Sequence, residues 1–231
     1  MSKLIAQTLT ARIRDMILKG EFCAGQHLRE VQLAEMFGVS RTPVRLALAA
    51  NERHGLLEYG PNRGYVVRSF LAKDIASAFE IRALVEGYSA RRAAEKGLSP
   101  EEERQMIEAI DSVSHLLGQE EILNESDHET WRNQNALYHR IISDKSGNRF
   151  VGPVLQSVQQ IPSVYPPVLT SYAPEKLRTY NDQHLRILEC ILRRESVRAE
   201  FLMREHILSA GDEILDSIKS SIGGSSAPPR V

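Results

Sequence analysis

The sequence predicts a mainly α-helical chain in two parts, and three observations support this fold class. Apolar residues recur at helical spacing through most of the 231 residues. Strand signals are confined to two short runs, residues 56–59 and 64–67, with a turn sequence between them. Charge is divided along the chain: residues 1–68 carry ten basic and six acidic side chains, whereas the remainder carries 19 and 24. We therefore expect a small basic module followed by a larger, acidic and all-helical one.

The composition is that of a globular protein without a membrane span. Hydrophobic residues make up 42% of the chain and charged residues 26%, as in soluble proteins. No apolar run approaches the ~18–20 residues that cross a bilayer, and the N-terminus lacks the apolar segment of a signal peptide. We expect a cytoplasmic protein that does not enter a membrane. Cys23 and Cys190 lie far apart in sequence, and we expect buried or unreactive thiols.

The N-terminal part is predicted to contain three helices and a β-hairpin. The first helix covers residues 8–19, which can form one apolar face before a glycine ends the helix. A second helix over residues 28–37 leads into a turn at Gly38, which suits a turn because glycine tolerates positive φ. The third helix follows, and residues 56–59 and 64–67 then pair around a Gly-Pro-Asn-Arg turn.

The start of the third helix is the most specific motif of the chain, Gly38-Val39-Ser40-Arg41-Thr42-Pro43-Val44-Arg45. Ser40 suits the N-cap, because its hydroxyl can accept a hydrogen bond from a first-turn amide. Arg41 and Arg45 are four residues apart and share one face, whereas Val44 can bury behind them. Arginine binds phosphate bidentately or reads O6 and N7 of guanine. Two helices joined in this way form a helix-turn-helix, whose expected DNA contacts are Ser40, Arg41, Thr42 and Arg45.

From Ile13 to Val67 the chain resembles the winged-helix domain of the GntR family of bacterial transcription regulators. The matching residues are Gly25, Leu28-Arg29-Glu30, Leu33-Ala34, Gly38 to Arg45, Ala47-Leu48 and Gly55-Leu56. The hairpin is then the wing, and Arg63 at its tip either reaches a phosphate or the minor groove or is a solvated turn arginine. Two positions depart from the family pattern: Leu46 replaces the usual Glu, and Asn51 the usual Leu. A core-facing Asn51 needs hydrogen-bond partners.

The second part is predicted to be an all-helical bundle. Ser99 and Glu102 form a capping-box pattern, with Pro100 at the first helical position. Residues 163–174 contain several prolines and cannot form one regular helix. The expected helices cover residues 74–96, 100–117, 126–146, 149–160, 175–193 and 197–217.

Three of the seven histidines lie on strong helical patterns: His139, His184 and His206. Asn135 precedes His139 by four residues, so both project from one helix face. Side chains from facing helices can converge inside a bundle to form a metal site. Spacing alone favours three unrelated histidines, because a single histidine near an apolar face is weak evidence for a ligand.

Residues 74–217 are similar to the FCD effector domain of FadR-like GntR proteins. The matching pieces are Glu80-Ile81-Arg82, Leu84-Val85-Glu86, Tyr138-His139, Ser146-Gly147-Asn148, His184 to Leu188, Ile191, Ala199, Met203 and His206. In many such domains an Asp and three His bind a divalent metal, which implies His139, His184 and His206 as ligands with Asn135 at the Asp position. A neutral amide lowers affinity, most of all for hard cations, so Zn or Ni is expected rather than Mg or Ca. A metal-free pocket is the alternative.

The resemblance also implies a role for an arginine in the second part. Arg82 matches the arginine that commonly faces the effector in this family, and a guanidinium beside a metal would trap a carboxylate. The alternative is a surface Arg82 paired with Glu86 one helical turn later. Trp131 either walls the same pocket or is an ordinary core residue.

The leading interpretation is a ligand-responsive transcription regulator that binds a palindromic, double-stranded DNA operator as a homodimer, with a small organic acid as effector. One alternative is a metal-dependent hydrolase fused to a DNA-targeting module, for which Glu86 is the nearest general base. Another is a constitutive architectural DNA-binding dimer. The expected organisation is a winged helix-turn-helix domain at residues 1–68, a linker at 69–73, a helical effector-binding and dimerisation domain at 74–218 and a disordered tail at 219–231.

Overall fold

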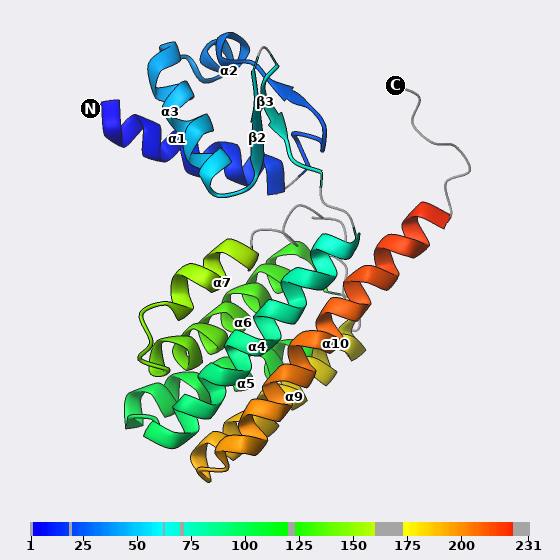
Figure 1. Ribbon diagram of the computed structural model, residues 1–231. Helices are drawn as coiled ribbons and strands as arrows, with labels where there is room; N and C mark the ends of the chain where they lie inside the picture. The colour runs from blue at the N-terminus through cyan, green and yellow to red at the C-terminus, as the bar shows by residue number, and fades with distance from the viewer. Residues whose placement is uncertain are drawn as a thin grey trace. The chain divides into compact units, whose positions relative to one another are not determined.

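The computed structural model describes residues 2–18, 20–61, 63–69, 72–119, 123–159 and 173–223. The chain divides into two compact units with a boundary between Ile75 and Ala76, and the described residues 157–159 are grouped with the first unit. The first unit is a small winged helix-turn-helix and the second is a helical bundle, so the mainly α-helical fold class is confirmed (Figure 1). Among the described residues, no helix is long and apolar enough to cross a membrane.

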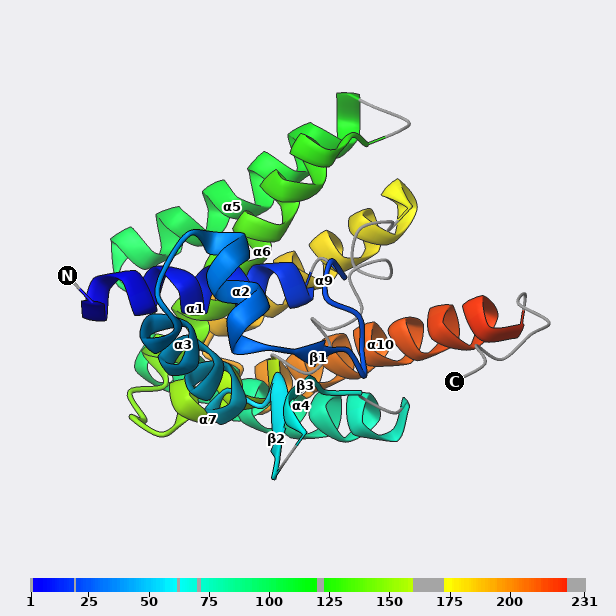
Figure 2. The ribbon, with the colours of Figure 1, turned by 90° about the horizontal axis from the view of Figure 1, so that it is seen from above.

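The winged unit contains three helices and a small antiparallel sheet (Figure 2). Its elements are α1 (Ser2–Leu18), β1 (His27–Leu28), α2 (Glu30–Phe37), α3 (Arg41–Arg53), β2 (Leu57–Gly60) and β3 (Gly64–Val67). The sheet order is β1-β3-β2, with Tyr59 opposite Tyr65 in the hairpin. The sequence did not predict β1, because two residues are too few to show a period-2 pattern; the segment is a strand only because it pairs with β3.

The core of the winged unit lies where α1 crosses α3. Ile13 on α1 and both Val44 and Leu48 on α3 are fully buried, as expected for the rear face of the third helix. Helix α1 begins at Ser2 rather than at residue 8, because Ala6 continues its buried face by one more turn. Helix α2 begins at Glu30 rather than residue 28 because Leu28 belongs to β1.

The turn before α3 is confirmed in its backbone but not in its cap. Gly38 ends α2 in the left-handed region, with φ 64°, where glycine has no steric penalty. Ser40 occupies the N-cap position of α3 with an extended backbone, but its hydroxyl makes no capping hydrogen bond. A serine cap usually bonds the amide of the second or third helical residue. The third is Pro43, which has no N–H, so the expected cap was wrong.

The helical unit consists of long helices that pack on their neighbours in sequence and, for α5 and α9, on a helix distant in sequence (Figure 1). Its elements are α4 (Ala72–Lys96), α5 (Pro100–Gln119), α6 (Glu125–Lys145), α7 (Val151–Gln159), α9 (Pro174–Leu192) and α10 (Ser196–Gly223). Helix α5 packs against both α6 and α9, and α9 packs on α10. Helices α4 and α10 approach closely, because a Cβ atom at Gly87 would lie 2.5 Å from Cγ of Arg204. This close approach brings residues of α4 near those of α10.

The predicted helix limits need several corrections. Helix α4 already includes residues 72 and 73, which were assigned to the linker, and α10 continues to Gly223, so residues 219–223 are helical rather than disordered. The capping box of Ser99 and Glu102 is confirmed by hydrogen bonds in both directions. The predicted irregular segment at residues 163–174 lies almost wholly outside the described residues, as do the rest of the tail and part of the linker.

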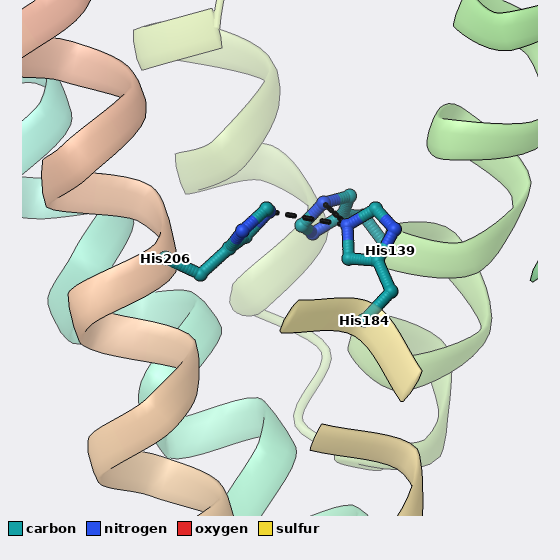
Figure 3. A group of neighbouring side chains, drawn as sticks. All are labelled: His139, His184 and His206. Atoms are coloured by element: carbon teal, nitrogen blue, oxygen red, sulfur yellow. Dashed lines mark hydrogen bonds between the residues drawn. The ribbon is translucent and has the colours of Figure 1, made fainter. Parts of the chain in front are cut away.

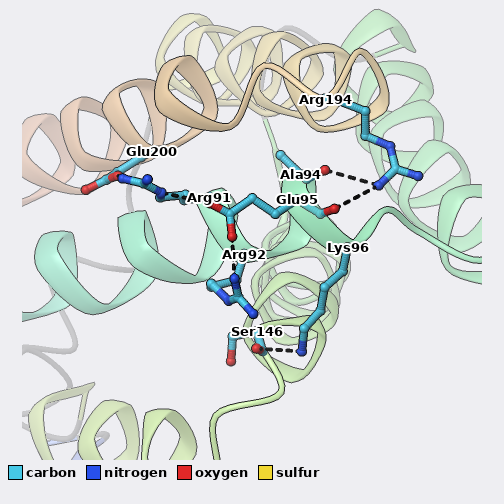
Figure 4. Close-up of polar contacts among 8 residues, drawn as sticks. All are labelled: Arg91, Arg92, Ala94, Glu95, Lys96, Ser146, Arg194 and Glu200. Carbon is cyan, nitrogen blue, oxygen red and sulfur yellow. Dashed lines mark hydrogen bonds and ion pairs between the residues drawn. The ribbon is translucent and has the colours of Figure 1, made fainter.

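Positively charged side chains cap the C-terminal ends of α4 and α6 (Figure 4). One guanidinium nitrogen of Arg194 donates to the carbonyl oxygens of Ala94 (3.2 Å) and Glu95 (3.3 Å). Lys96 Nζ donates to the carbonyl of Ser146 over 2.9 Å. Helix C-termini carry partial negative charge and unpaired carbonyls, so these cations stabilise both ends and fix how the two helices meet.

Candidate functional site

The three predicted histidines converge inside the helical unit (Figure 3). His139 comes from α6, His184 from α9 and His206 from α10, and all three are at least 93% buried. Nε2 of His184 lies 3.2 Å from Nε2 of His139 and 3.1 Å from Nε2 of His206. The interpretation of three unrelated histidines is therefore wrong.

Aromatic and backbone contacts hold His184 in the centre of this group. The ring of Tyr138 stacks on the His184 ring, with centroids 4.2 Å apart. The Tyr138 hydroxyl donates a 2.7 Å hydrogen bond to the backbone carbonyl of His184. Because Tyr138 precedes His139 on α6, this bond ties the helix of one histidine to the helix of another.

Two of the histidines have partners at their outer nitrogens. Nδ1 of His139 lies 2.6 Å from Oε2 of Glu86, which is 1% exposed. Nδ1 of His206 lies 2.7 Å from Oε1 of Gln183. Metal-binding histidines usually donate their other ring N–H to a carboxylate or a carbonyl in this way. With hydrogens on Nδ1, both Nε2 atoms present lone pairs to the centre of the cluster.

Burial keeps two imidazoles of the cluster, those of His184 and His206, neutral. Burial, together with His206 and His139, holds the pKa of His184 well below its usual value. Burial and then His139 lower the pKa of His206 to about 3. Burial would raise the pKa of Glu86, but Arg82 and His139 outweigh burial and lower it to about 2. Near neutral pH the cluster therefore combines the neutral imidazoles of His184 and His206 with the carboxylate anion of Glu86.

The donor set fits a divalent metal ion. The ligand nitrogens of His139, His184 and His206 all lie within 4.8 Å of one another. Nitrogens that share a tetrahedral zinc ion at ~2.0–2.1 Å are about 3.3–3.4 Å apart, close to the observed 3.1 and 3.2 Å. Three lone pairs at this spacing repel one another unless a proton or a cation lies between them. The three histidines can therefore hold a metal.

Asn135, the expected fourth ligand, lies beside this group on the wall of a small cavity. The cavity volume is about 10 Å³, enough for one water molecule. His184 lines the same cavity, so Asn135 and a cluster histidine face a shared space; a metal contact by Asn135 remains a prediction. Trp131 also lines the cavity and at the same time packs in a core cluster with Leu177.

Arg82 is paired with Glu86 in this structure. Nε of Arg82 donates a 3.0 Å hydrogen bond to Oε1 of Glu86, and its guanidinium lies 4.9 Å from the ring centroid of Phe79. The alternative interpretation of Arg82 was a surface residue paired with Glu86 one helical turn later. The pair is present, but the Arg82 side chain is only 16% exposed. Glu86 uses its second oxygen on His139. Because both oxygens are engaged, Glu86 is poorly placed to act as the general base of a hydrolase.

The expected DNA-contacting residues form one exposed face of α3. Arg41, Thr42 and Arg45 are exposed, while Pro43 and Val44 between them are buried, as are Ala47 and Leu48 further along the helix. The guanidinium of Arg41 forms a 3.3 Å ion pair with Glu30 at the start of α2. Leu46 continues the same face and is 51% exposed, so the replaced glutamate position carries an apolar side chain next to Arg45.

Arg63 lies beside a groove between α2 and the wing that the sequence did not reveal. The groove has a volume of about 460 Å³, and its wall includes Arg29, Arg41 and Arg63. Two tyrosines from the hairpin, Tyr59 and Tyr65, complete this wall with ring centroids 5.0 Å apart. Cross-strand alternation places both on one face of the hairpin, which is the signal that could have identified them.

Asn51 is fully buried between α3 and α1 and is only partly satisfied. Its Nδ2 donates to the carbonyls of Thr10 (3.1 Å) and Ala47 (2.9 Å). Its Oδ1 has no hydrogen-bond partner. The sequence indicated that an asparagine here needs partners, and the structure supplies them for the amino group alone.

Comparison with known proteins matches each unit to a family. Residues 77–209 match the FCD domain, and residues 5–67 match the bacterial regulatory proteins of the gntR family. The matched segments correspond to the helical unit and to the winged unit, respectively.

Full-length relatives cover both units. The chain is 27% identical over 201 residues to the uncharacterized HTH-type transcriptional regulator YdhC of Bacillus subtilis. The aligned region covers 86% of this chain and 84% of YdhC. It is 24% identical over 202 residues to the HTH-type transcriptional repressor GlaR of Escherichia coli, and the aligned region covers 85% of this chain and 90% of GlaR. Among solved structures, E. coli McbR/YncC matches with a TM-score of 0.73 at 18% identity, over 93% of this chain and 98% of that one. This structural likeness supports the fold.

Proposed function

The chain belongs to the GntR family of bacterial transcription regulators and carries an FCD domain, and from this we propose that it binds a palindromic operator as a homodimer and responds to a small carboxylate. The DNA-binding half of the proposal is supported by the exposed face of α3. Arg41, Thr42 and Arg45 lie within the first turns of that helix, the part that reaches base edges in helix-turn-helix proteins. Ser40 precedes them, and Arg63 would add a backbone contact from the wing.

An apolar stripe on α4 supports the homodimer. Ile81, Leu84 and Tyr88 are 42%, 50% and 37% exposed and follow one another at spacings of three and four residues. Such spacing places them along one face of the helix. A contiguous apolar stripe on an otherwise charged helix is best covered by an identical stripe, since a two-fold interface pairs the same surface with itself. Leu84→Glu should therefore convert the dimer to a monomer in sedimentation velocity runs.

The ligand-responsive half of the proposal is supported by the histidine cluster. Neutral imidazoles favour Zn or Ni over Mg or Ca, and Asn135 is the expected fourth contact. A divalent ion held by neutral side chains keeps its full charge, while the Arg82–Glu86 pair is neutral overall. The site would therefore attract an anion, and the terminal nitrogens of Arg82, which the Glu86 pair through Nε does not use, would meet its carboxylate.

The observation that carries the proposal is the burial of three converging imidazoles in a chain whose other unit exposes a basic recognition helix. The test begins with native mass spectrometry and metal analysis of the purified protein. An operator is then selected from random duplex DNA, and its affinity is measured by fluorescence anisotropy with Zn²⁺ and a panel of short mono-, di- and tricarboxylates. A change of at least fivefold in operator affinity is expected for one carboxylate. Selected DNA that is insensitive to metal and to every carboxylate would instead identify a constitutive architectural dimer.

A further inference from the structure

The outer partners of His139 and His206 differ in the hydrogen bonds that they can make. Glu86 is an ionised carboxylate and can only accept, so Nδ1 of His139 carries a hydrogen. Gln183 is an amide, with an oxygen that accepts and an NH2 group that donates. Either end of this amide can face Nδ1 of His206, 2.7 Å away. Glu86 therefore fixes its histidine in one tautomer, whereas Gln183 can support two.

The two orientations of the Gln183 amide have opposite effects on the cluster. When the oxygen faces His206, as observed, Nδ1 carries the hydrogen and Nε2 offers a lone pair. When the NH2 group faces His206, Nδ1 must accept, and the hydrogen moves to Nε2. That hydrogen then points along the 3.1 Å path to Nε2 of His184, which can accept it. The first orientation turns the Nε2 lone pair of His206 toward the cluster, and the second places a hydrogen there that pairs His206 with His184 without any ion.

We propose that Gln183 is a positioning residue that selects the tautomer of His206, and that turning its amide over converts the cluster between a metal-binding and a metal-free arrangement. The inference rests on the metal site proposed above. Metal ligation requires a bare ring nitrogen on each histidine. Rotation of the amide about its terminal bond requires no movement of any helix, and Gln183 is only half-buried on α9.

The proposal predicts opposite results for two substitutions at one position. Gln183→Glu provides a group that can only accept, so it should hold His206 in the metal-binding tautomer and raise affinity for Zn²⁺ by about tenfold. Gln183→Leu provides an apolar side chain that supplies no hydrogen bond, and should lower affinity by ~10–100-fold, as for other outer partners of metal ligands. Gln105→Glu and Gln105→Leu are the matched controls, because Gln105 is half-buried on α5, as Gln183 is on α9, and its amide pairs with Glu101 at the surface.

The experiment uses the full-length protein and measures two quantities. Zn²⁺ affinity is measured by competition with a chromogenic chelator. The tautomer of His206 is read from the ring ¹⁵N chemical shifts of histidine-labelled protein, first stripped of metal and then loaded with Zn²⁺. Metal-free wild type should populate both tautomers of His206. After Zn²⁺ is added, only the Nδ1–H tautomer should remain. Metal-free Gln183→Glu should already be in the Nδ1–H form, and circular dichroism checks that each variant is folded.

The tautomer measurement separates failure of this inference from failure of the metal site. If wild type binds no Zn²⁺, the metal site is wrong, but Gln183→Glu must still shift His206 toward Nδ1–H for the inference to stand. If wild type binds Zn²⁺ and His184→Ala does not, while both Gln183 variants stay within twofold of wild type with an unchanged His206 tautomer, the metal site stands and the role of Gln183 is overturned.

Discussion

The recognition helix and the histidine cluster present their functional side chains in opposite ways. Arg41, Thr42 and Arg45 are exposed on one helix, and the contact from this set to another helix is the ion pair of Arg41 with Glu30 on α2. His139, His184 and His206 point inward from three different helices, and the first and last of these residues are 67 positions apart in sequence. An exposed site of the first kind tolerates change around it, because solvent replaces lost contacts. A buried site of the second kind does not, because each lost partner leaves a polar group without water.

The largest expected effect comes from the buried charge at the edge of the cluster. Glu86→Gln removes the carboxylate that balances Arg82 and accepts from His139, and breaking a buried pair in this way costs ~3–5 kcal/mol. Chemical denaturation of the helical unit should show this loss. Glu80→Gln, an exposed substitution on the same helix, should change stability by less than ~0.5 kcal/mol. Equal losses of stability in Glu86→Gln and Glu80→Gln would contradict the expected difference between buried and exposed carboxylates.

The next effect concerns metal-linked stability. At a free Zn²⁺ concentration 100 times the dissociation constant, binding stabilises the folded state by ~2.7 kcal/mol. His184→Ala removes the nitrogen between the other two and should abolish this shift in thermal unfolding. His54→Ala, at an exposed histidine of the winged unit, should retain it. Operator binding by metal-free His184→Ala should match that of metal-free wild type. A metal response that survives in His184→Ala would make the histidines structural.

A smaller effect is expected on the exposed face. Arg45→Ala should weaken operator binding by ~1–3 kcal/mol with relaxed specificity at one base pair if Arg45 reads a base. If Arg45 contacts only phosphate, affinity should fall for all sequences. The slope of log affinity against log salt concentration should then decrease by about one released ion. Anisotropy titrations on operator and scrambled duplexes at several salt concentrations distinguish these cases. Protein stability should not change, and Arg53→Ala near the end of α3 provides the matched control.

The smallest effect concerns Asn51, a buried polar residue on α3 behind the exposed face of that helix. Asn51→Leu replaces an amide whose Oδ1 has no partner and leaves behind two carbonyls within helices. We expect the winged unit to gain ~1 kcal/mol, because an unsatisfied buried acceptor costs ~1–3 kcal/mol. Thermal unfolding measures the gain. A loss of stability would mean that the hydrogen bond from Nδ2 to Thr10 is essential for holding α1 on α3.

The same contrast explains what the sequence could predict. Helix periodicity, Gly38 and the Ser99–Glu102 box depend on neighbours within a few residues, and these predictions were confirmed. The residues of the cluster were identified through resemblance, since spacing alone favoured unrelated histidines. Gln183 could not be recognised from the sequence, because its role depends on His206, a residue on another helix. The failed Ser40 cap is different: the missing amide of Pro43 was visible in the sequence.

Helix α4 contributes to two surfaces at once. Arg82 and Glu86 face the histidine cluster, while Ile81 and Leu84 lie on the exposed stripe of the same two turns. An α-helix is a stiff rod whose side chains turn together, so rotation of α4 about its axis shifts both sets by the same angle. Any rotation of α4 that followed a change of charge at the cluster would therefore also move the stripe. Natural variation in one set should accordingly be limited by the other, and α4 should accept substitutions more readily as compensating pairs than singly.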